Sequence, residues 1–285
     1  MAKLLLAKEV NEGLKSAWEG DLSKLRDRGV TPTLATVRVG QKGPDISYEK
    51  GIVKKMTSYD LGVKNIVLDE DIDQESLINE IRKLSHDPQV HGILLFQPLD
   101  ERFDDRKVKE AICKKKDVDC ATAENLGSTL AGWSDGFSYC APQAVMEILH
   151  YYDIPIKGRE FCIIGSGLVV GRPLAMLLSN ELATVSLCNV FTEDSRVYSK
   201  RANVVISAAG VPGLIDETYV EPGQILIDVG TSFVNGKLKG DVNREAVEGI
   251  VEALTPTPGG VSGITTTVLA KHLIRACKSL TEGEK

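Results

Sequence analysis

The stretch FCIIGSGLVVGRP, residues 161–173, decides the fold. Its apolar run ends at Gly165, and Gly167 and Gly171 follow closely. This order is typical of a buried strand, a tight turn and a helix start, where glycines let the backbone approach a ligand and exposed N–H groups attract an anion. The usual dinucleotide fingerprint would place its third glycine at position 170, where this chain has Val170. We therefore interpret the stretch as a candidate nucleotide-binding turn, with an ordinary strand-to-helix connection as the alternative.

Strands and helices are predicted to alternate along the whole chain. Apolar runs predict strands over residues 31–40, 64–69, 90–99, 161–165, 183–188, 203–210 and 224–230, and helix-period patterns predict helices over 7–28, 45–61, 73–87, 104–115, 141–154, 169–181 and from 264 onwards. Such alternation predicts an α/β fold of two domains, each an open, mostly parallel sheet with helices, the C-terminal one Rossmann-like. We expect the first domain to span residues 1–139 and the second 140–263, with the last helix, 264–285, packing back on the first.

Composition limits the class of function. A chain of 285 residues that is 42% hydrophobic and 26% charged is typical of a globular protein, and its net charge of −6 argues against a nucleic-acid partner. No apolar run approaches the roughly 20 residues that a membrane span needs, and the N-terminal MAKLLLAKEV does not resemble a signal peptide. The six cysteines form no C-x-x-C pair, and the four histidines show no metal-ligand spacing. We therefore expect a reducing, cytoplasmic compartment, no membrane and no metal.

Segments of unusual composition follow the predicted strands. They are VGQKGPDISYEKG, QPLD, GSGLVVG, AAGVPG, DVGTS and TPTPGGVSG. Because open α/β sheets bind ligands beyond the carboxyl ends of their strands, we expect these segments to form the site. The alternatives are ordinary turns for AAGVPG and DVGTS, a solvated charge run for residues 114–120, and a solvent-facing helix surface for Tyr48, Lys50, Lys54 and Lys55.

Together these segments point to a known family. The segments are VRVG with Tyr48 nine positions after Val39, KDVD at 116–119, CAP at 140–142, IKG at 156–158, IIGSGLVVGRPLAMLL, ATVSLC, AAGVPGLI, VEPGQILIDVG, GDV at 240–242, and TPTPGGV before a Thr-rich helix start. Over essentially the whole chain they resemble the bifunctional methylenetetrahydrofolate dehydrogenase/cyclohydrolase family. The resemblance implies a folate-binding catalytic domain, a dinucleotide-binding domain, a deep cleft that holds the folate, and usually a homodimer.

The resemblance also implies an activity and a set of site residues. The activity is hydride transfer from 5,10-methylenetetrahydrofolate to NAD or NADP, and in bifunctional members hydrolysis of 5,10-methenyltetrahydrofolate to 10-formyltetrahydrofolate. Matched by position, Tyr48 and Lys54 are catalytic, and Asp119 suits the pterin because a carboxylate accepts two parallel N–H bonds from an aminopyrimidinone edge. Folate contacts fall on Tyr48, Gln97, Asp119, Pro258, Gly259, Gly260 and Val261, and coenzyme contacts on Gly165, Ser166, Gly167, Gly171, Asn189, Ala209, Gly210, Gly230 and Thr231.

Two departures from the family pattern concern catalysis. The family's lysine comes four residues after the tyrosine, where this chain has Ile52, but counting back from Gly62 places Lys54 at that position. The family's glutamine corresponds to Phe96, with Gln97 one residue along, and one step in a strand points a side chain to the opposite face. These departures leave open a bifunctional enzyme, a dehydrogenase alone, and a catalytically degenerate paralogue that binds folate or nucleotide. A dehydrogenase of the two-domain type acting on shikimate or amino acids would not explain KDVD together with PGGV.

A third departure concerns the coenzyme. NADP-using members have an arginine and a serine where this chain has Ser166 and Val190. Arginine pairs phosphate oxygens bidentately, whereas Ser166 offers one neutral hydrogen bond and Val190 offers none. The sequence therefore predicts a preference for NAD over NADP, with Arg172, Arg196 or Lys200 as alternative phosphate ligands.

Overall fold

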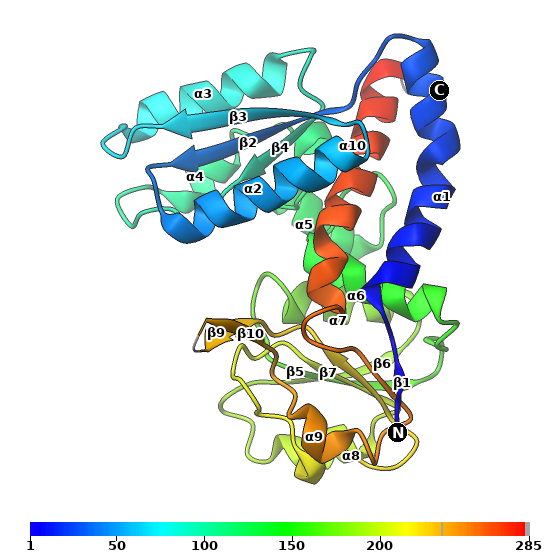
Figure 1. Cartoon of the computed structure of the whole chain (residues 1–285). Helices are drawn as coiled ribbons and strands as arrows, with labels where there is room; N and C mark the ends of the chain where they lie inside the picture. Colours follow the sequence, from blue (N-terminus) through cyan, green and yellow to red (C-terminus); the bar gives the residue numbers. More distant parts are fainter. Residues whose placement is uncertain (235, 283–285) are drawn as a thin grey trace. The chain divides into compact units, whose positions relative to one another are not determined.

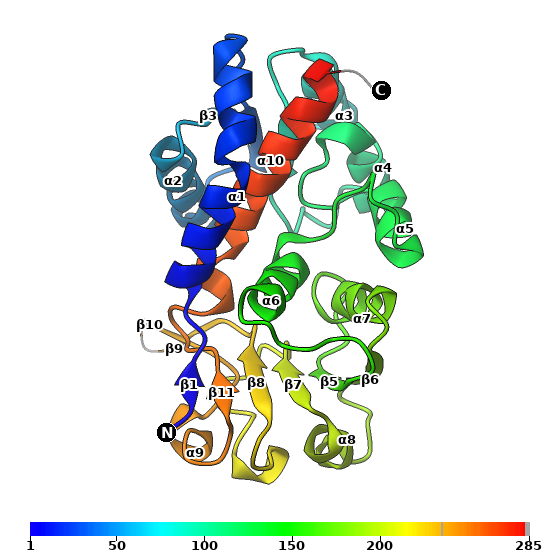
Figure 2. The ribbon, with the colours of Figure 1, turned by 90° about the vertical axis from the view of Figure 1, so that its right-hand side faces the viewer.

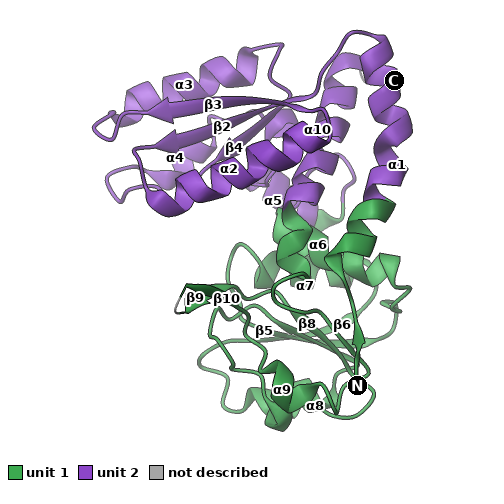
Figure 3. Cartoon of the chain, in the orientation of Figure 1, with its two compact units in different colours: residues 1–13, 130–132, 139–265 green, residues 14–129, 133–138, 266–285 purple. Residues whose placement is uncertain are grey.

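The structure is a computed structural model that describes residues 1–234 and 236–282 of the chain. Asn235 of the predicted turn and residues 283–285 of the predicted last helix lie outside the described residues. The chain forms two compact units (Figure 3). Unit 1 contains residues 1–13, 130–132 and 139–265, and unit 2 contains residues 14–129, 133–138 and, within the described chain, 266–282. Each is built from a parallel sheet and helices, which confirms the predicted α/β fold.

Unit 1 is built on a six-stranded parallel sheet. Its strands lie in the order β1 (Lys3–Leu4), β11 (Ala253–Leu254), β8 (Ile225–Asp228), β7 (Val204–Ser207), β5 (Glu160–Ile164) and β6 (Thr184–Cys188), as Figure 2 shows. After β1 at one edge, the chain returns to this sheet at β5, continues to β6 on one side and then crosses to β7 on the other, so the strand order reverses at β5. In doubly wound sheets this topological switch point is where ligands bind.

Several further elements complete unit 1. They are α6 (Cys140–Tyr151), α7 (Gly171–Asn180), α8 (Ser195–Arg201), α9 (Arg244–Val247), the antiparallel pair β9 (Ser232–Val234) and β10 (Lys237–Lys239), and the 3₁₀ helices η2 (Glu217–Tyr219) and η3 (Val261–Gly263). Residues 1–13 also belong to this unit, whereas the sequence analysis assigns them to the first domain. Strand β1 has only two residues and pairs with β11 near the other end of the chain, so no local pattern reveals it.

Unit 2 is built on a three-stranded parallel sheet. Its order is β3 (Gly62–Leu68), β2 (Thr33–Val39) and β4 (Gly92–Leu95), so β2 is again flanked by the two strands that follow it. Helix α2 (Gly43–Ser58) covers one face, and α3 (Gln74–His86) and α4 (Asp105–Lys109) pack their apolar side chains on the other (Figure 1). The segment after β4 adds one more parallel bridge, from Asp117 to Ile93.

The remaining helices are two long ones, which the sequence predicts, and two short ones that follow α4. Helices α1 (Ala7–Asp27) and α10 (Thr265–Glu282) begin in unit 1 and continue in unit 2, and η1 (Lys114–Lys116) and α5 (Ala123–Ala131) follow α4. Helix α5, which the sequence does not predict, begins after Thr122, the acceptor of the Asn125 N–H at 3.3 Å. None of the described helices combines the length and the apolar character that a membrane span requires.

Candidate active site

A cavity of about 580 Å³ lies in unit 1 beyond the carboxyl ends of β5, β6 and β7. It is lined by Ile164, Gly165, Ser166, Gly167, Asn189, Val190, Thr192, Glu193, Asp194, Ser195, Arg196, Ala208, Ala209, Val211, Leu214 and Tyr219. The cavity thus lies at the switch point of the sheet, where the rule for doubly wound folds places a ligand. Five of the predicted coenzyme residues line it, namely Gly165, Ser166, Gly167, Asn189 and Ala209. Gly171, Gly210, Gly230 and Thr231 do not line it.

The turn between β5 and α7 can be built only with glycine at two positions. Gly165 has φ +115°, and a Cβ there would lie 2.3 Å from the Ala208 carbonyl oxygen. A Cβ on Gly171 would lie 1.8 Å from the Gly165 carbonyl oxygen. The glycine that comes one residue late in the fingerprint, Gly171, is therefore the one that lets the start of α7 contact the turn. The backbone cradle fits a dinucleotide phosphate, because the first N–H groups of a helix attract anions.

A pair of buried carboxylates supports the neighbouring turn AAGVPG. Asp241 Oδ2 accepts hydrogen bonds from Ser207 Oγ (2.9 Å), Ala209 N (2.8 Å) and Gly210 N (3.1 Å). Asp228 in turn accepts from Asp241 N at 3.0 Å, and burial raises the pKa of Asp228 to about 6. Asp241 lies in the GDV motif, for which the sequence alone predicts no role. Its structural role is to hold Gly210, which explains why Gly210 shapes the site without lining the cavity.

An ion pair lies at the other end of the cavity, on the loop after β6. Asp194 accepts from Arg196 Nε at 2.8 Å and from the Arg196 terminal nitrogen at 3.2 Å, and this pairing lowers the pKa of Asp194. Both residues line the cavity. Of the alternative phosphate ligands, Arg172 bonds the Ser166 carbonyl at 3.0 Å and Lys200 pairs with Glu221 at 3.4 Å, and neither lines it.

The PGGV loop also belongs to unit 1. A cis peptide joins Thr257 to Pro258, Gly259 has φ +104°, and its carbonyl oxygen accepts the Ala7 N–H at 2.8 Å. Gly260 precedes η3, whose first residue, Val261, is buried. The predicted residues of this loop are thus held in one defined backbone path.

In unit 2, Tyr48 packs on the residue that replaces the family's glutamine. The rings of Tyr48 and Phe96 meet edge to face, with centroids 5.9 Å apart and planes at 73°. Phe96 is buried, whereas Tyr48 is 47% exposed. Strand β4 ends at Leu95, so Gln97 lies in the following turn, exposed, and not on the opposite face of a strand as the sequence analysis expects. The expected strand 90–99 is too long because Pro98 has no N–H to donate to a ladder.

The lysine candidates on α2 differ in their surroundings. Ile52 is completely buried, so the position four residues after Tyr48 belongs to the core. Lys54 is exposed, and Lys55 lies with its Nζ 5.1 Å above the Tyr59 ring. Of the two lysines, Lys54 is the more exposed residue.

The segment KKKDVDC is not a solvated charge run. Asp117 is completely buried and accepts hydrogen bonds from Ala121 N, Thr122 N, Thr122 Oγ1 and Asn125 Nδ2 at 2.7–2.9 Å. Lys116 is buried as well, donates to the Asp87 carbonyl at 2.7 Å, and has its pKa lowered by burial. These contacts fix the turn on which Asp119, partly exposed, is carried.

A histidine that the sequence analysis does not consider contacts the same turn. His272 of α10 is buried and its Nδ1 lies 2.9 Å from the Val118 carbonyl oxygen. Burial lowers the pKa of His272 to about 3, so the ring is neutral and its Nδ1–H donates. Phe137 stacks against the ring with centroids 5.2 Å apart. His272 and Asp117 therefore hold the backbone on either side of Val118, next to Asp119.

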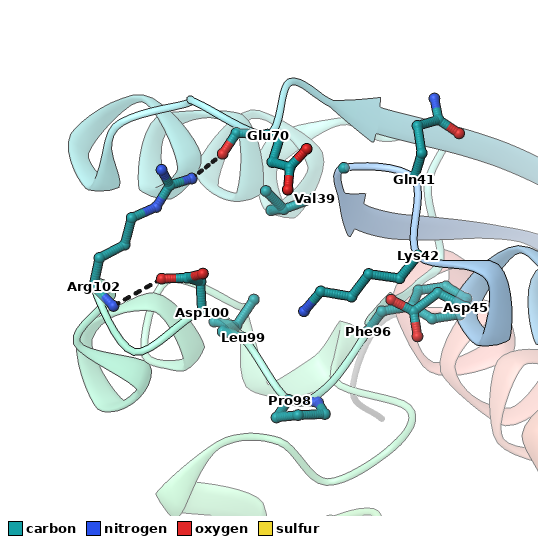
Figure 4. Close-up of a pocket in the computed structure, with 11 residues that line it drawn as sticks. Val39, Gln41, Lys42, Asp45, Glu70, Phe96, Pro98, Leu99, Asp100 and Arg102 are labelled. Atoms are coloured by element: carbon teal, nitrogen blue, oxygen red, sulfur yellow. Dashed lines mark hydrogen bonds between the residues drawn. The ribbon is translucent and has the colours of Figure 1, made fainter.

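Unit 2 has its own cavity, of about 190 Å³, beyond the carboxyl ends of its strands (Figure 4). Its lining residues are Val39, Gly40, Gln41, Lys42, Asp45, Glu70, Phe96, Pro98, Leu99, Asp100 and Arg102. None of the predicted folate residues lines it, although the residues on either side of Gln97 do. Two of the segments expected to form the site, VGQKGPDISYEKG and QPLD, supply most of the lining, whereas none of its residues was predicted individually as a site residue.

A parallel sheet with a glycine turn and a cavity at its switch point defines unit 1 as a dinucleotide-binding unit. Comparison with known families agrees. Residues 139–281 match the tetrahydrofolate dehydrogenase/cyclohydrolase NAD(P)-binding domain, and residues 5–119 match the catalytic domain of the same family. The chain belongs to the tetrahydrofolate dehydrogenase/cyclohydrolase family, which confirms the resemblance found in the sequence.

Individual relatives match over nearly their whole length. The bifunctional protein FolD of Alkaliphilus metalliredigens is 41% identical over 281 residues, which are 98% of this chain and 98% of the relative. The crystal structure of the bifunctional enzyme FolD from Campylobacter jejuni has a TM-score of 0.94 at 34% identity and covers 98% of this chain and 99% of its own. The dehydrogenase-cyclohydrolase of Trypanosoma brucei, complexed with NADP and an inhibitor, has a TM-score of 0.89 at 28% identity over 99% of both chains.

Proposed function

We propose that this protein oxidises 5,10-methylenetetrahydrofolate with a nicotinamide coenzyme and hydrolyses 5,10-methenyltetrahydrofolate to 10-formyltetrahydrofolate. The observation that carries the proposal is the glycine turn from Gly165 to Gly171 beside the unit 1 cavity, in a chain whose other unit matches the family's catalytic domain. The nicotinamide ring supplies the hydride acceptor. The protein's own task is to hold the two rings in contact, which is a positioning effect.

The test is the rise in nicotinamide absorbance when the purified protein is mixed with methylenetetrahydrofolate and coenzyme. Turnover that is absent with both NAD and NADP would contradict the proposal and favour the degenerate paralogue. Turnover without accelerated decay of methenyltetrahydrofolate would favour a dehydrogenase alone.

For folate binding we propose Asp119 as the pterin ligand and Tyr48 as the aromatic surface beside it. Asp119 is carried on a turn that Asp117 and His272 fix, and Tyr48 is half exposed on the buried ring of Phe96. Gln97 and the loop from Pro258 to Val261 are proposed to complete the contacts. Fixed supports of this kind suit a site in which a small displacement of the reacting atoms lowers the rate.

For hydrolysis we propose Lys54 as the proton-transferring group. A lysine side chain positioned at the methenyl ring can take up and release a proton, as general acid–base catalysis of the hydrolysis requires. Lys55, the residue after Lys54, is the matched control, because its ammonium lies against the Tyr59 ring. We expect Lys54→Met to abolish most of the enzyme-dependent decay of methenyltetrahydrofolate, followed by its absorbance, and Lys55→Met to retain it. Decay that survives both substitutions would exclude Lys54.

For the coenzyme we propose NAD. Glu193 and Asp194 line the cavity, where carboxylates can accept hydrogen bonds from ribose hydroxyls, and Arg196 is already paired with Asp194. A 2′-phosphate would have to compete with Asp194 for that guanidinium. The test is the ratio of kcat/KM for NAD and NADP on one folate substrate. A ratio that favours NADP would overturn the preference for NAD. If Arg196→Gln then abolished the advantage of NADP, Arg196 would be identified as the phosphate ligand.

We also propose a homodimer that resides in the cytoplasm. Strand β6 is an edge strand of the unit 1 sheet. Leu187 in this strand and Leu182 just before it are 37% and 62% exposed. Five of the six cysteines are buried and all six are free thiols. Sedimentation equilibrium tests the dimer, and a monomer that is fully active would contradict it.

A further inference from the structure

The unit 2 cavity and the segment that carries the proposed pterin ligand lie along the same sheet of unit 2. The bridge between Ile93 and Asp117 places the segment that carries Asp119 beside β4, so the order across the sheet edge is β3, β2, β4 and then this segment. Neighbouring strands are about 4.8 Å apart, so about 14 Å separates the Asp119 segment from β3. The cavity extends across the carboxyl ends of all three strands, because Val39 belongs to β2, Glu70 follows β3, and Phe96 and Asp100 follow β4.

Two lining residues connect the cavity with Tyr48, which is proposed to contact folate. Phe96 lines the cavity and also supports the ring of Tyr48. Asp45, another lining residue, precedes Tyr48 by three positions on α2 and therefore shares its helix face. Folate is a linear molecule in which a pterin, a p-aminobenzoyl ring and a glutamate follow one another. With the pterin on Asp119 and the benzoyl ring beside Tyr48, the glutamate would reach the cavity.

We propose that this cavity binds the glutamate end of the folate substrate and that Lys42 receives its carboxylates. Figure 4 shows the Lys42 side chain extending into the cavity. Among the described residues, none forms a hydrogen bond or an ion pair with its ammonium. The apolar lining residues Phe96, Pro98 and Leu99 suit the benzoyl ring and the methylene groups of the glutamate. The inference rests on the folate substrate proposed above and adds a subsite to it.

The loop that carries Lys42 is held by a buried ion pair. Arg38 donates from Nε to Glu49 at 2.9 Å, and both residues are less than a tenth exposed. The same guanidinium bonds the Gly40 carbonyl oxygen and the Gln41 side-chain oxygen. The backbone that leads into Lys42 is therefore fixed from the core of unit 2. The second cation of the cavity, Arg102, is engaged by the backbone carbonyl of Glu70.

Three carboxylates also line the cavity, so anion binding there depends on Lys42. They belong to Asp45, Glu70 and Asp100, of which Asp100 accepts the Arg102 N–H at 3.1 Å. Acidic groups repel an anionic ligand, so binding of a glutamate depends on the ammonium that reaches among them. Removal of Lys42 would leave the ligand carboxylates facing like charges.

The experiment compares the natural monoglutamyl substrate with an analogue whose two glutamate carboxylates are carboxamides. The two differ only in charge at the tail. Lys42→Met should raise the KM for the natural substrate about fivefold or more, the size of a partly exposed charge contact, and leave kcat unchanged. It should leave the KM for the diamide unchanged, and the wild-type protein should bind the diamide about fivefold more weakly than the acid.

Lys50→Met is the matched control, because Lys50 is an exposed lysine of α2, the helix that Lys42 precedes, and does not line the cavity. It should change neither KM. Equal effects of Lys42→Met on both substrates, or no effect on either, would overturn the subsite while leaving the activity intact. Lys42→Glu should raise the acid KM further, and its circular dichroism and Tm show whether the fold is preserved. Wild-type protein that turns over neither substrate would instead refute the proposed function itself.

Discussion

The two units use the same strand order to build different kinds of site. In unit 1, β5 lies between β6 and β7, in unit 2, β2 lies between β3 and β4, and a cavity opens beyond the carboxyl ends in each. The turn in unit 1 is shaped by the glycines Gly165 and Gly171, whereas long side chains such as Lys42, Phe96 and Arg102 line the cavity of unit 2. A site made from backbone depends on where side chains are absent. A site made from side chains depends on packing and on the phase of a helix.

The largest effect is expected in unit 2, where one buried carboxylate organises the turn beside the proposed pterin ligand. Asp117→Ala removes the acceptor for four donors, and at about 1 kcal/mol or more each this should lower the free energy of unfolding by about 4 kcal/mol. Asp119→Ala, two residues along, should lower the free energy of unfolding by less than Asp117→Ala does, because Asp119 is partly exposed, and should raise the folate KM at least about tenfold with coenzyme affinity intact. Denaturant titration and steady-state kinetics measure the two effects. Equal loss of stability in both variants would remove the distinction between support and ligand.

The matching change in unit 1 tests whether its site depends on backbone. Gly171→Ala should destabilise the protein by about 2 kcal/mol and weaken coenzyme binding, because its Cβ would meet the Gly165 carbonyl oxygen at 1.8 Å. Gly167→Ala is the control, since a Cβ at Gly167 meets nothing within 4 Å. Its Tm should stay close to that of the wild type. The Tm and the coenzyme Kd are the measurements, and an unchanged Kd in Gly171→Ala would show that the turn does not form the coenzyme site.

This contrast also explains what the sequence could predict. The strand, turn and helix around Gly165 follow one another within a dozen residues, so local patterns reveal the unit 1 turn and most strands of both sheets. The spacing fault at Val170 could not be interpreted from sequence, because the contact of Gly171 with Gly165 is made in three dimensions. The short strand β1 escaped prediction because its partner lies near the far end of the chain.

The side-chain site of unit 2 was predicted less completely. Tyr48 and Asp119 were found through the family resemblance, and their supports were not. The Asp117 network, the contact of His272 with Val118 and the Lys42 cavity all join segments distant in sequence. Charged letters such as those of residues 114–116 favour a solvated run, and only the fold shows that Lys116 is buried.

An intermediate effect is expected from the pH dependence of His272. Its pKa is lowered to about 3 in the folded state and is about 6.5 in the unfolded chain, so its contribution to stability is fully present above pH 6.5 and is lost as the pH falls towards 3. By pH 5 the loss is about 2 kcal/mol, at about 1.4 kcal/mol per pH unit. His272→Asn can still donate to Val118 but does not titrate.

The measurement is the free energy of unfolding at pH 7 and pH 5 for both proteins. The wild type should lose about 2 kcal/mol more than His272→Asn over this interval. Asp228, whose raised pKa acts in the opposite direction, is common to both proteins and cancels in the difference. A folate KM that rises in His272→Leu and is restored in His272→Asn would show that the histidine positions the Asp119 turn. Parallel pH curves for the wild type and His272→Asn would contradict the buried, neutral ring.

The smallest effect is expected where unit 2 differs from its family, at Phe96. An edge-to-face aromatic contact contributes about 1 kcal/mol, so a double-mutant cycle of Phe96→Leu and Tyr48→Leu should give a coupling energy near that value. Because Phe96 fixes the ring that is proposed to contact folate, Phe96→Leu should raise the folate KM about two- to fivefold, in line with that coupling, and leave the coenzyme KM unchanged. A zero coupling energy together with an unchanged folate KM would mean that Phe96 fills space next to Tyr48 without orienting it. In that case the site of unit 2 would depend on its carboxylates and on Lys42 alone, and Phe96 would belong to the core.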